Sequence, residues 1–218
     1  YTYAIPADAV PGATYARFRL STDPLTDPVA LDLNGGEVED YACTIGDVEY
    51  DYGDNPPSYG SFGIAVNTGT PSWLGSAPDA DPNMQSNPDA NGDDNDGNDD
   101  EDGITFVGGT DLIPGTTKDI ALSWTTFDAD AYIYGWIDFN QDGDFDPDEV
   151  IINEYPVGSG TTGVSDTGNE TFTIAVPVDA VCGKTYARFY IHDDTGIAPV
   201  GLYSNDGEVE DYALNIQS

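Results

Sequence analysis

The clearest chemical pattern in the sequence is an acidic loop of twelve residues, 138–149, which reads DFNQDGDFDPDE. Side chains with oxygen atoms occupy its first, third and fifth positions, a glycine stands at the sixth, and a glutamate closes it. Calcium takes about six to eight hard oxygen ligands, which alternate residues of a tight loop can supply. The pattern predicts a Ca²⁺ ion held by Asp138, Asn140, Asp142, Asp144, Asp146 and Glu149.

The residues on either side of this loop are typical of strands. Tyr132–Ile137 is rich in strand formers, and Pro147 interrupts the loop itself. We therefore expect a calcium loop placed between strands rather than between helices. An acidic hairpin turn without metal is the alternative.

A second acidic stretch, residues 89–102, consists mostly of Asp, Asn and Gly. Such a composition favours disorder, and wrapping cations is the simplest way to order it. Its register is ambiguous, and a solvated acidic spacer is the alternative. The ligands that we predict here are Asp89, Asn91, Asp93, Asp96, Asp100 and Asp102.

The string GEVEDYA occurs twice, at 36–42 and at 207–213. In a strand, Glu208 and Glu210 share one face, and Asp211 lies on the other face beside Val209. If the valine faces a core, Asp211 needs a partner, because a bare buried charge is costly. Two partners stay open: Arg188, or a calcium ion shared with Asp193 and Asp194.

This repetition extends over 47 residues at a constant offset of 171, and 25 of the aligned positions are identical. Duplication predicts that residues 1–47 are the second half of one repeat. Residues 48–104, rich first in Tyr and Pro and then in Asp, are predicted to be a connector. Residues 105–218 are predicted to be one complete repeat.

Strand formers and frequent turn signals dominate the complete repeat, and no stretch has a convincing helical period. We predict an all-β fold: immunoglobulin-like β-sandwich repeats joined by an Asp-rich calcium-binding connector. The predicted strands are Lys118–Trp124, Ala131–Asp138, Val150–Glu154, Glu170–Val176, Thr185–His192 and Val209–Ile216.

The net charge of −36, from 41 acidic and five basic residues, limits the possible partners. It excludes nucleic-acid binding through phosphate contacts and argues against docking on anionic membranes. No apolar run is long enough for direct membrane insertion. Self-repulsion of this size must be offset, either by bound divalent cations or by high external salt, as in a halophilic protein.

Taken together, the motifs resemble the GEVED domain family of bacterial secreted and surface proteins. The resemblance rests on WIDFN at 136–140, DGDF at 142–145, YARF at 186–189 and the GEVEDY string. DYGD at 51–54 and the acidic run at 92–103 resemble the spacer that often precedes such domains. The resemblance implies exported multidomain proteins, including adhesins, and a β-sandwich without an activity of its own.

The sequence thus favours a structural, calcium-rigidified repeat of an extracellular surface protein, adhesin stalk or filament. Its partners would be neighbouring copies that assemble head to tail by strand complementation. The alternative is a calcium-dependent module that binds a glycan or protein ligand through aromatics such as Trp73, Tyr132 and Tyr134. We do not expect an enzyme, because the lone His192 lies in no catalytic motif. Whether Cys43 and Cys182 form a disulfide stays open.

Overall fold

The structure is a computed structural model that describes residues 5, 9–22, 35–66, 69–92 and 100–218. It divides the chain into two compact units, Tyr1–Asp47 and Val48–Ser218. Apart from one short 3-10 turn, η1 (Pro57–Tyr59), the regular elements of the described residues are strands. The all-β prediction is therefore confirmed. These residues include no helix of the length and hydropathy that crossing a bilayer requires.

The described part of the first unit is an antiparallel hairpin of β1 (Gly12–Ser21) and β2 (Gly36–Ile45). Its register places Arg17 opposite Asp40. Large apolar side chains of both strands are exposed, including Phe18 and Val38. Cys43 of this hairpin is free, as is Cys182 of the second unit.

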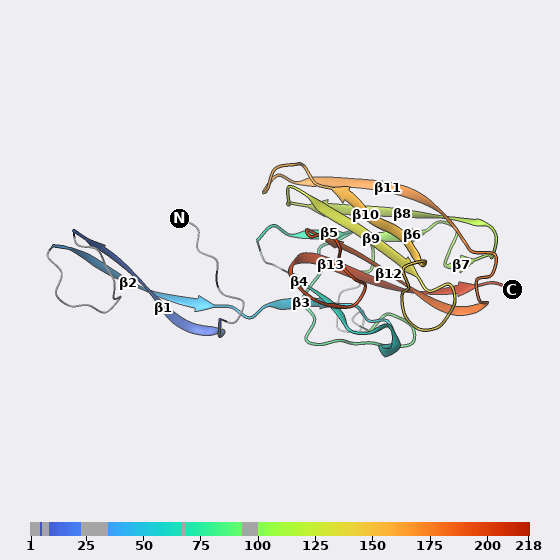
Figure 1. The fold of residues 1–218 in the computed structure, drawn as a ribbon, viewed down its shortest axis with the longest axis horizontal. Helices are drawn as coiled ribbons and strands as arrows, with labels where there is room; N and C mark the ends of the chain where they lie inside the picture. The colour runs from blue at the N-terminus through green and yellow to red at the C-terminus, as the bar shows by residue number, and fades with distance from the viewer. Residues whose placement is uncertain (1–4, 6–8, 23–34, 67–68, 93–99) are drawn as a thin grey trace. The chain divides into compact units, whose positions relative to one another are not determined.

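The second unit contains two sheets, which Figure 1 shows lying over one another. The larger has the order β10 (Val150–Val157), β9 (Ala131–Ile137), β12 (Gly183–His192), β13 (Gly201–Ile216), β4 (Phe62–Val66) and β3 (Glu49–Tyr52), with β7 (Asp111–Leu112) also beside β13. The smaller has the order β11 (Asp166–Ala175), β8 (Thr117–Thr126) and β5 (Ser72–Leu74), with β6 (Ile104–Phe106) also beside β8. This arrangement is consistent with a β-sandwich. The immunoglobulin-like topology stays a prediction.

An apolar core lies between the two sheets because their strands alternate apolar and polar residues. In β8, Ile120, Leu122 and Trp124 are buried while the residues between them are partly exposed. They join Phe189 of β12 and Leu214 of β13 in this cluster, which we call the inter-sheet core. Burial of such side chains is the main stabilising contribution to the unit.

A second apolar cluster is formed mainly by aromatic side chains of the larger sheet. Tyr134 and Tyr190 stack with ring centroids 4.7 Å apart, and Trp136 lies 5.3 Å from Tyr190. Residues 48–66, here called the covering segment, contribute Tyr59 and Phe62 to it. Residues 48–104, predicted to be a connector, thus supply β3, β4 and β5 to the sheets and belong to the second compact unit.

Candidate metal centre

The acidic loop 138–149 connects β9 to β10, and its ends are held by backbone hydrogen bonds. The amide of Ile137 donates to the carbonyl of Glu149 (3.2 Å), and the amide of Asp138 donates to Tyr186 of β12 (3.1 Å). Two phenylalanines fix the loop on either side: Phe139 belongs to the inter-sheet core and Phe145 to the aromatic cluster. Gly143 has a φ of +92°, which a glycine adopts without strain.

The first and last carboxylates of the loop accept hydrogen bonds from loop amides. Asp138 accepts from the amides of Gln141 (2.5 Å) and Gly143 (3.1 Å), and from the hydroxyl of Tyr59 (2.6 Å). Glu149 accepts from three amides, those of Phe139 (2.9 Å), Asn140 (3.2 Å) and Asp146 (3.0 Å). Each ionised carboxylate has about four lone-pair sites, so these contacts leave capacity for a cation.

Three further carboxylates of the loop gather at one place. One oxygen each of Asp142, Asp144 and Asp146 lies within 4.8 Å of the other two. The charge of Asp142 is the main cause that raises the pKa of Asp144, followed by burial and the charge of Asp146. Asn140 lies alongside, since its side-chain amide donates to Asp142 (2.9 Å). Hard oxygen atoms that repel one another at this spacing fit a calcium ion.

Burial of Glu149 also favours a cation. Its side chain is buried, which raises its pKa to about 7 against the opposing effect of its amide donors. A bound cation would stabilise the ionised form and reverse that shift. The structure therefore brings the carboxylates of Asp142, Asp144 and Asp146 together, whereas Asp138 and Glu149 lie on the same connection between two strands but outside that group. The donor types of the six predicted residues fit calcium.

The predicted ligands of the second acidic stretch do not converge in the part that the structure describes. Asp93 and Asp96 lie outside the described residues. Asp89 pairs with Lys184 (2.6 Å), and Asn91 accepts from the side-chain amide of Asn87 (3.1 Å). The other two face a different segment: Asp102 accepts from the amide of Ser76 (2.6 Å), and Asp100 accepts from that of Asp79 (3.1 Å).

Asp211 has Arg188 as its partner, which was the first of the two alternatives. Nε of Arg188 lies 2.7 Å from Oδ1, and Nη2 lies 2.6 Å from Oδ2, with both side chains 0% exposed. The amide of Asn55 donates to the same carboxylate (2.9 Å), and the guanidinium lies 4.9 Å from the ring of Phe62. These contacts satisfy Asp211 without a metal ion.

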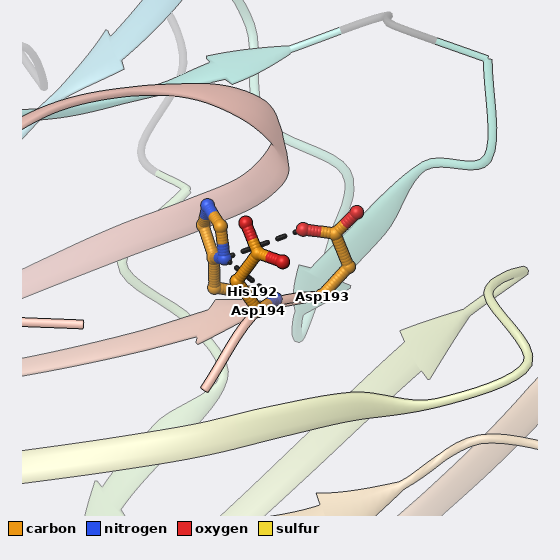
Figure 2. A group of neighbouring side chains, drawn as sticks. All are labelled: His192, Asp193 and Asp194. Atoms are coloured by element: carbon orange, nitrogen blue, oxygen red, sulfur yellow. Dashed lines mark hydrogen bonds and ion pairs between the residues drawn. The ribbon is translucent and has the colours of Figure 1, made fainter. Parts of the chain in front are cut away.

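Asp193 lies instead beside His192 and Asp194 at the end of β12, as Figure 2 shows. Nδ1 of His192 accepts the amide of Asp194 (2.9 Å), and Oδ1 of Asp193 lies 3.3 Å from the same nitrogen. Burial lowers the pKa of His192, and burial together with the charges of Asp194 and Asp128 raises that of Asp193 to about 6. Because the imidazole accepts at Nδ1, this contact is not an ion pair.

The three aromatic residues considered as contacts for a glycan or protein ligand are partly or fully buried in the second unit. Tyr134 is 1% exposed in the aromatic cluster, whereas Trp73 is half-buried with its ring 5.9 Å from Phe127.

Sequence reasoning assigned no role to Tyr59, Asp51, Glu208 or Glu210, all of which the structure buries among polar partners. A signal for the two glutamates was available. Their side of the strand continues to Leu214 and Ile216, so a pattern with period two turns them toward the core.

Comparison with known protein families finds the GEVED domain, whose family model matches residues 132–215. The matched region contains the acidic loop, the Arg188–Asp211 pair and the second copy of the GEVEDYA string. The comparison with curated proteins found no significant match.

Proposed function

We propose that the unit 48–218, whose residues 132–215 match the GEVED domain family, is a calcium-stabilised structural module of an extracellular surface protein. The observation that carries this proposal is the loop 138–149, where Asp142, Asp144 and Asp146 meet within 4.8 Å. A cation there removes repulsion among carboxylates, which otherwise opposes the compact state. The role is non-catalytic: calcium sets the rigidity of the repeat.

The hydrogen bond from Tyr59 to Asp138 supports a mechanical role for the loop. It joins the first loop ligand to the covering segment, and the ring of Tyr59 lies 4.9 Å from that of Phe145. Calcium bound in the loop would therefore stabilise the covering segment as well as the connection between β9 and β10. A rigid repeat of this kind suits an adhesin stalk or a filament.

Neighbouring copies are the partners that fit this role. Tyr15, Phe18 and Leu20 of β1 are 80%, 63% and 72% exposed. In the second unit the homologous strand β12 lies beside β9, which supports strand complementation from another copy as the means of assembly. Native mass spectrometry across a range of protein concentrations tests it: growing oligomers are expected, and a monomer at every concentration contradicts it.

Thermal unfolding in calcium and in excess chelator, at one fixed high sodium chloride concentration, tests the calcium role. Calcium at a hundred times its dissociation constant stabilises the folded state by about 2.7 kcal/mol. For a unit of this size that amounts to a rise in Tm of roughly 5–10 °C. The D142N/D144N variant should lose the loop's part of this rise. An identical Tm in calcium and in chelator would contradict the calcium role. If the Tm then rises when the same measurement is repeated at a higher sodium chloride concentration, halophilic adaptation is favoured instead.

A further inference from the structure

The only histidine of the chain lies in a second group of metal-ligand side chains, at the end of β12. One ligand atom each of His192, Asp193 and Asp194 lies within 4.8 Å of the other two, and Figure 2 shows both carboxylates on the Nδ1 side of the imidazole. The group shares no residue with the loop 138–149. Its donors differ as well, because an imidazole nitrogen suits zinc and other transition metals, whereas calcium takes oxygen ligands.

The imidazole is held in place by the larger sheet. His192 pairs with Gly207 of β13 on one side and with Tyr132 of β9 on the other. Its side chain is 1% exposed, and its ring meets the ring of Tyr203 edge to face, with centroids 5.5 Å apart. A ligand that is already fixed in this way loses little conformational entropy when an ion binds.

Two buried acceptor atoms face each other in this group. Nδ1 of His192 accepts the amide hydrogen of Asp194 (2.9 Å), so it has no hydrogen of its own to donate. Oδ1 of Asp193 lies 3.3 Å from that nitrogen and is buried without a hydrogen-bond partner among the residues that the structure describes. Buried polar atoms are satisfied in nearly all folded proteins, by a hydrogen bond, a water molecule or an ion. A cation between Nδ1 and Oδ1 would satisfy both atoms.

The separation of these two atoms fits a small ion. Zinc lies about 2.0–2.2 Å from imidazole nitrogens and carboxylate oxygens, usually in tetrahedral geometry. Two ligands at that distance and in that geometry are roughly 3.4 Å apart. The observed separation of Nδ1 and Oδ1 is 3.3 Å.

The third residue of the group, Asp194, is oriented by outer contacts. The side-chain amide of Asn205 donates to its Oδ2 (2.7 Å), and the hydroxyl of Tyr134 donates to its carbonyl (3.2 Å). Contacts of this kind hold metal ligands in position. An ion at Nδ1 must displace the amide of Asp194, because a neutral imidazole nitrogen has one lone pair. Asp194 is exposed, so its amide can donate to water instead.

We propose that His192, Asp193 and Asp194 bind a zinc ion through Nδ1 and the two carboxylates, with water completing the coordination. The ion reaches Nδ1 from the side of the two aspartates, which are partly or fully exposed. His192 and Asp193 stand in place of Ser21 and Thr22 of the first copy, so the site belongs to the second copy alone. The inference goes beyond the proposed role of calcium and does not depend on it.

The first test uses the wild-type chain, in which the single histidine makes the imidazole an unambiguous reporter. Zinc chloride is titrated at neutral pH into the full chain, made without a histidine tag, in saturating calcium, and nitrogen NMR follows the ring. We expect the Nδ1 resonance to shift as one equivalent of zinc binds, while Nε2 keeps its hydrogen. A ring spectrum that does not change in a large excess of zinc overturns the proposal.

The second test compares two variants by isothermal titration calorimetry with zinc, again in saturating calcium. D193N/D194N removes two ligands and keeps the buried ring, whereas the matched control D142N/D144N alters the calcium loop. Removal of direct ligands should weaken zinc binding by more than the roughly 10–100-fold that loss of an outer contact costs. The control should bind zinc as the wild type does.

Equal zinc affinity in the wild type and in both variants would place the ion elsewhere on the acidic surface and overturn the proposal. The NMR titration needs no variant, so it decides the matter if D193N/D194N does not fold. The calcium role is judged separately by thermal unfolding in chelator. Zinc binding at His192 can therefore stand while the proposed calcium role fails, and the reverse can also occur.

Discussion

The same hairpin occurs in both units of this protein, in two different environments. Strands β1 and β2 of the first unit and β12 and β13 of the second share the GEVEDYA string and an equivalent register. Arg17 faces Asp40 in one hairpin, and Arg188 faces Asp211 in the other. The side chains of the first pair are 46% and 51% exposed, and those of the second are 0% exposed.

The comparison separates what the motif does alone from what its surroundings add. The sequence of the hairpin is sufficient for the register and for the arginine–aspartate pair, since both are present in each unit. Burial comes from elements outside the hairpin, namely β4, β9 and the covering segment. The same residues are therefore a surface ion pair in one unit and a buried ion pair in the other.

Removing one partner from each pair gives the largest expected difference between the two copies. The D211N substitution leaves Arg188 buried without a counter-charge and should lower the free energy of unfolding by about 3–5 kcal/mol. The equivalent D40N change should cost far less, because that pair is solvated. Urea unfolding of the full chain measures both. Equal effects would mean that the burial of Arg188 adds nothing to the pair.

Removing the hydroxyl of Tyr59 weakens the attachment of the covering segment alone. The Y59F substitution keeps the ring contact with Phe145 and removes the hydrogen bond to Asp138, a loss of about 1.5–3 kcal/mol for a bond to an ionised group. Tyr41 is the matched control, since its hydroxyl donates to the exposed Glu39 (2.5 Å). Urea unfolding and calcium affinity should change in Y59F and stay unchanged in Y41F; the reverse would contradict the assigned role of the segment.

Adding a methyl group at Gly53 tests how tightly the buried Arg188–Asp211 pair is packed. A Cβ atom there would lie 2.6 Å from Oδ2 of Asp211 and 2.7 Å from Nη2 of Arg188, and both of these side chains are fully buried. The G53A substitution should therefore destabilise the unit by about 1–3 kcal/mol. Gly46 beside the first hairpin has open space around it, so G46A is the control. Calorimetry that found the two variants equally stable would show that the ion pair yields easily.

The fold class and the loop could be predicted because both depend on local patterns. Alternation in 118–124 is sufficient for a strand, and the structure places that stretch within β8. The twelve positions of 138–149 carry their ligand types in sequence order. The choice between Arg188 and a calcium ion for Asp211 could not be made from the sequence, because it depends on which strand lies opposite.

The role of residues 48–66 could not be predicted from the sequence either. Their Tyr, Asp and Pro content describes local conformation and suggests a connector. Their actual contacts are with Tyr134, Trp136 and Tyr190, which are distant in the sequence and form a cluster only after β9 and β12 pair. Period-two alternation could have placed Glu208 toward the core, but not the amide of Leu74 that donates to it.

The smallest effect concerns the end of the hairpin, where the copies differ: His192 and Asp193 stand in place of Ser21 and Thr22. The pKa of Asp193, about 6 in the folded state against an ordinary 3.8, means that the folded state binds the proton more tightly. Its contribution to stability is present below pH 3.8 and is lost as pH rises to about 6. His192 has the opposite sign: burial lowers its pKa, so its contribution to stability rises with pH through about 6.5.

Urea unfolding in chelator should therefore show that the difference in unfolding free energy between wild type and D193N declines by roughly 1 kcal/mol between pH 4 and 6. A difference that is constant with pH would place Asp193 in an environment as solvated as that of the first copy.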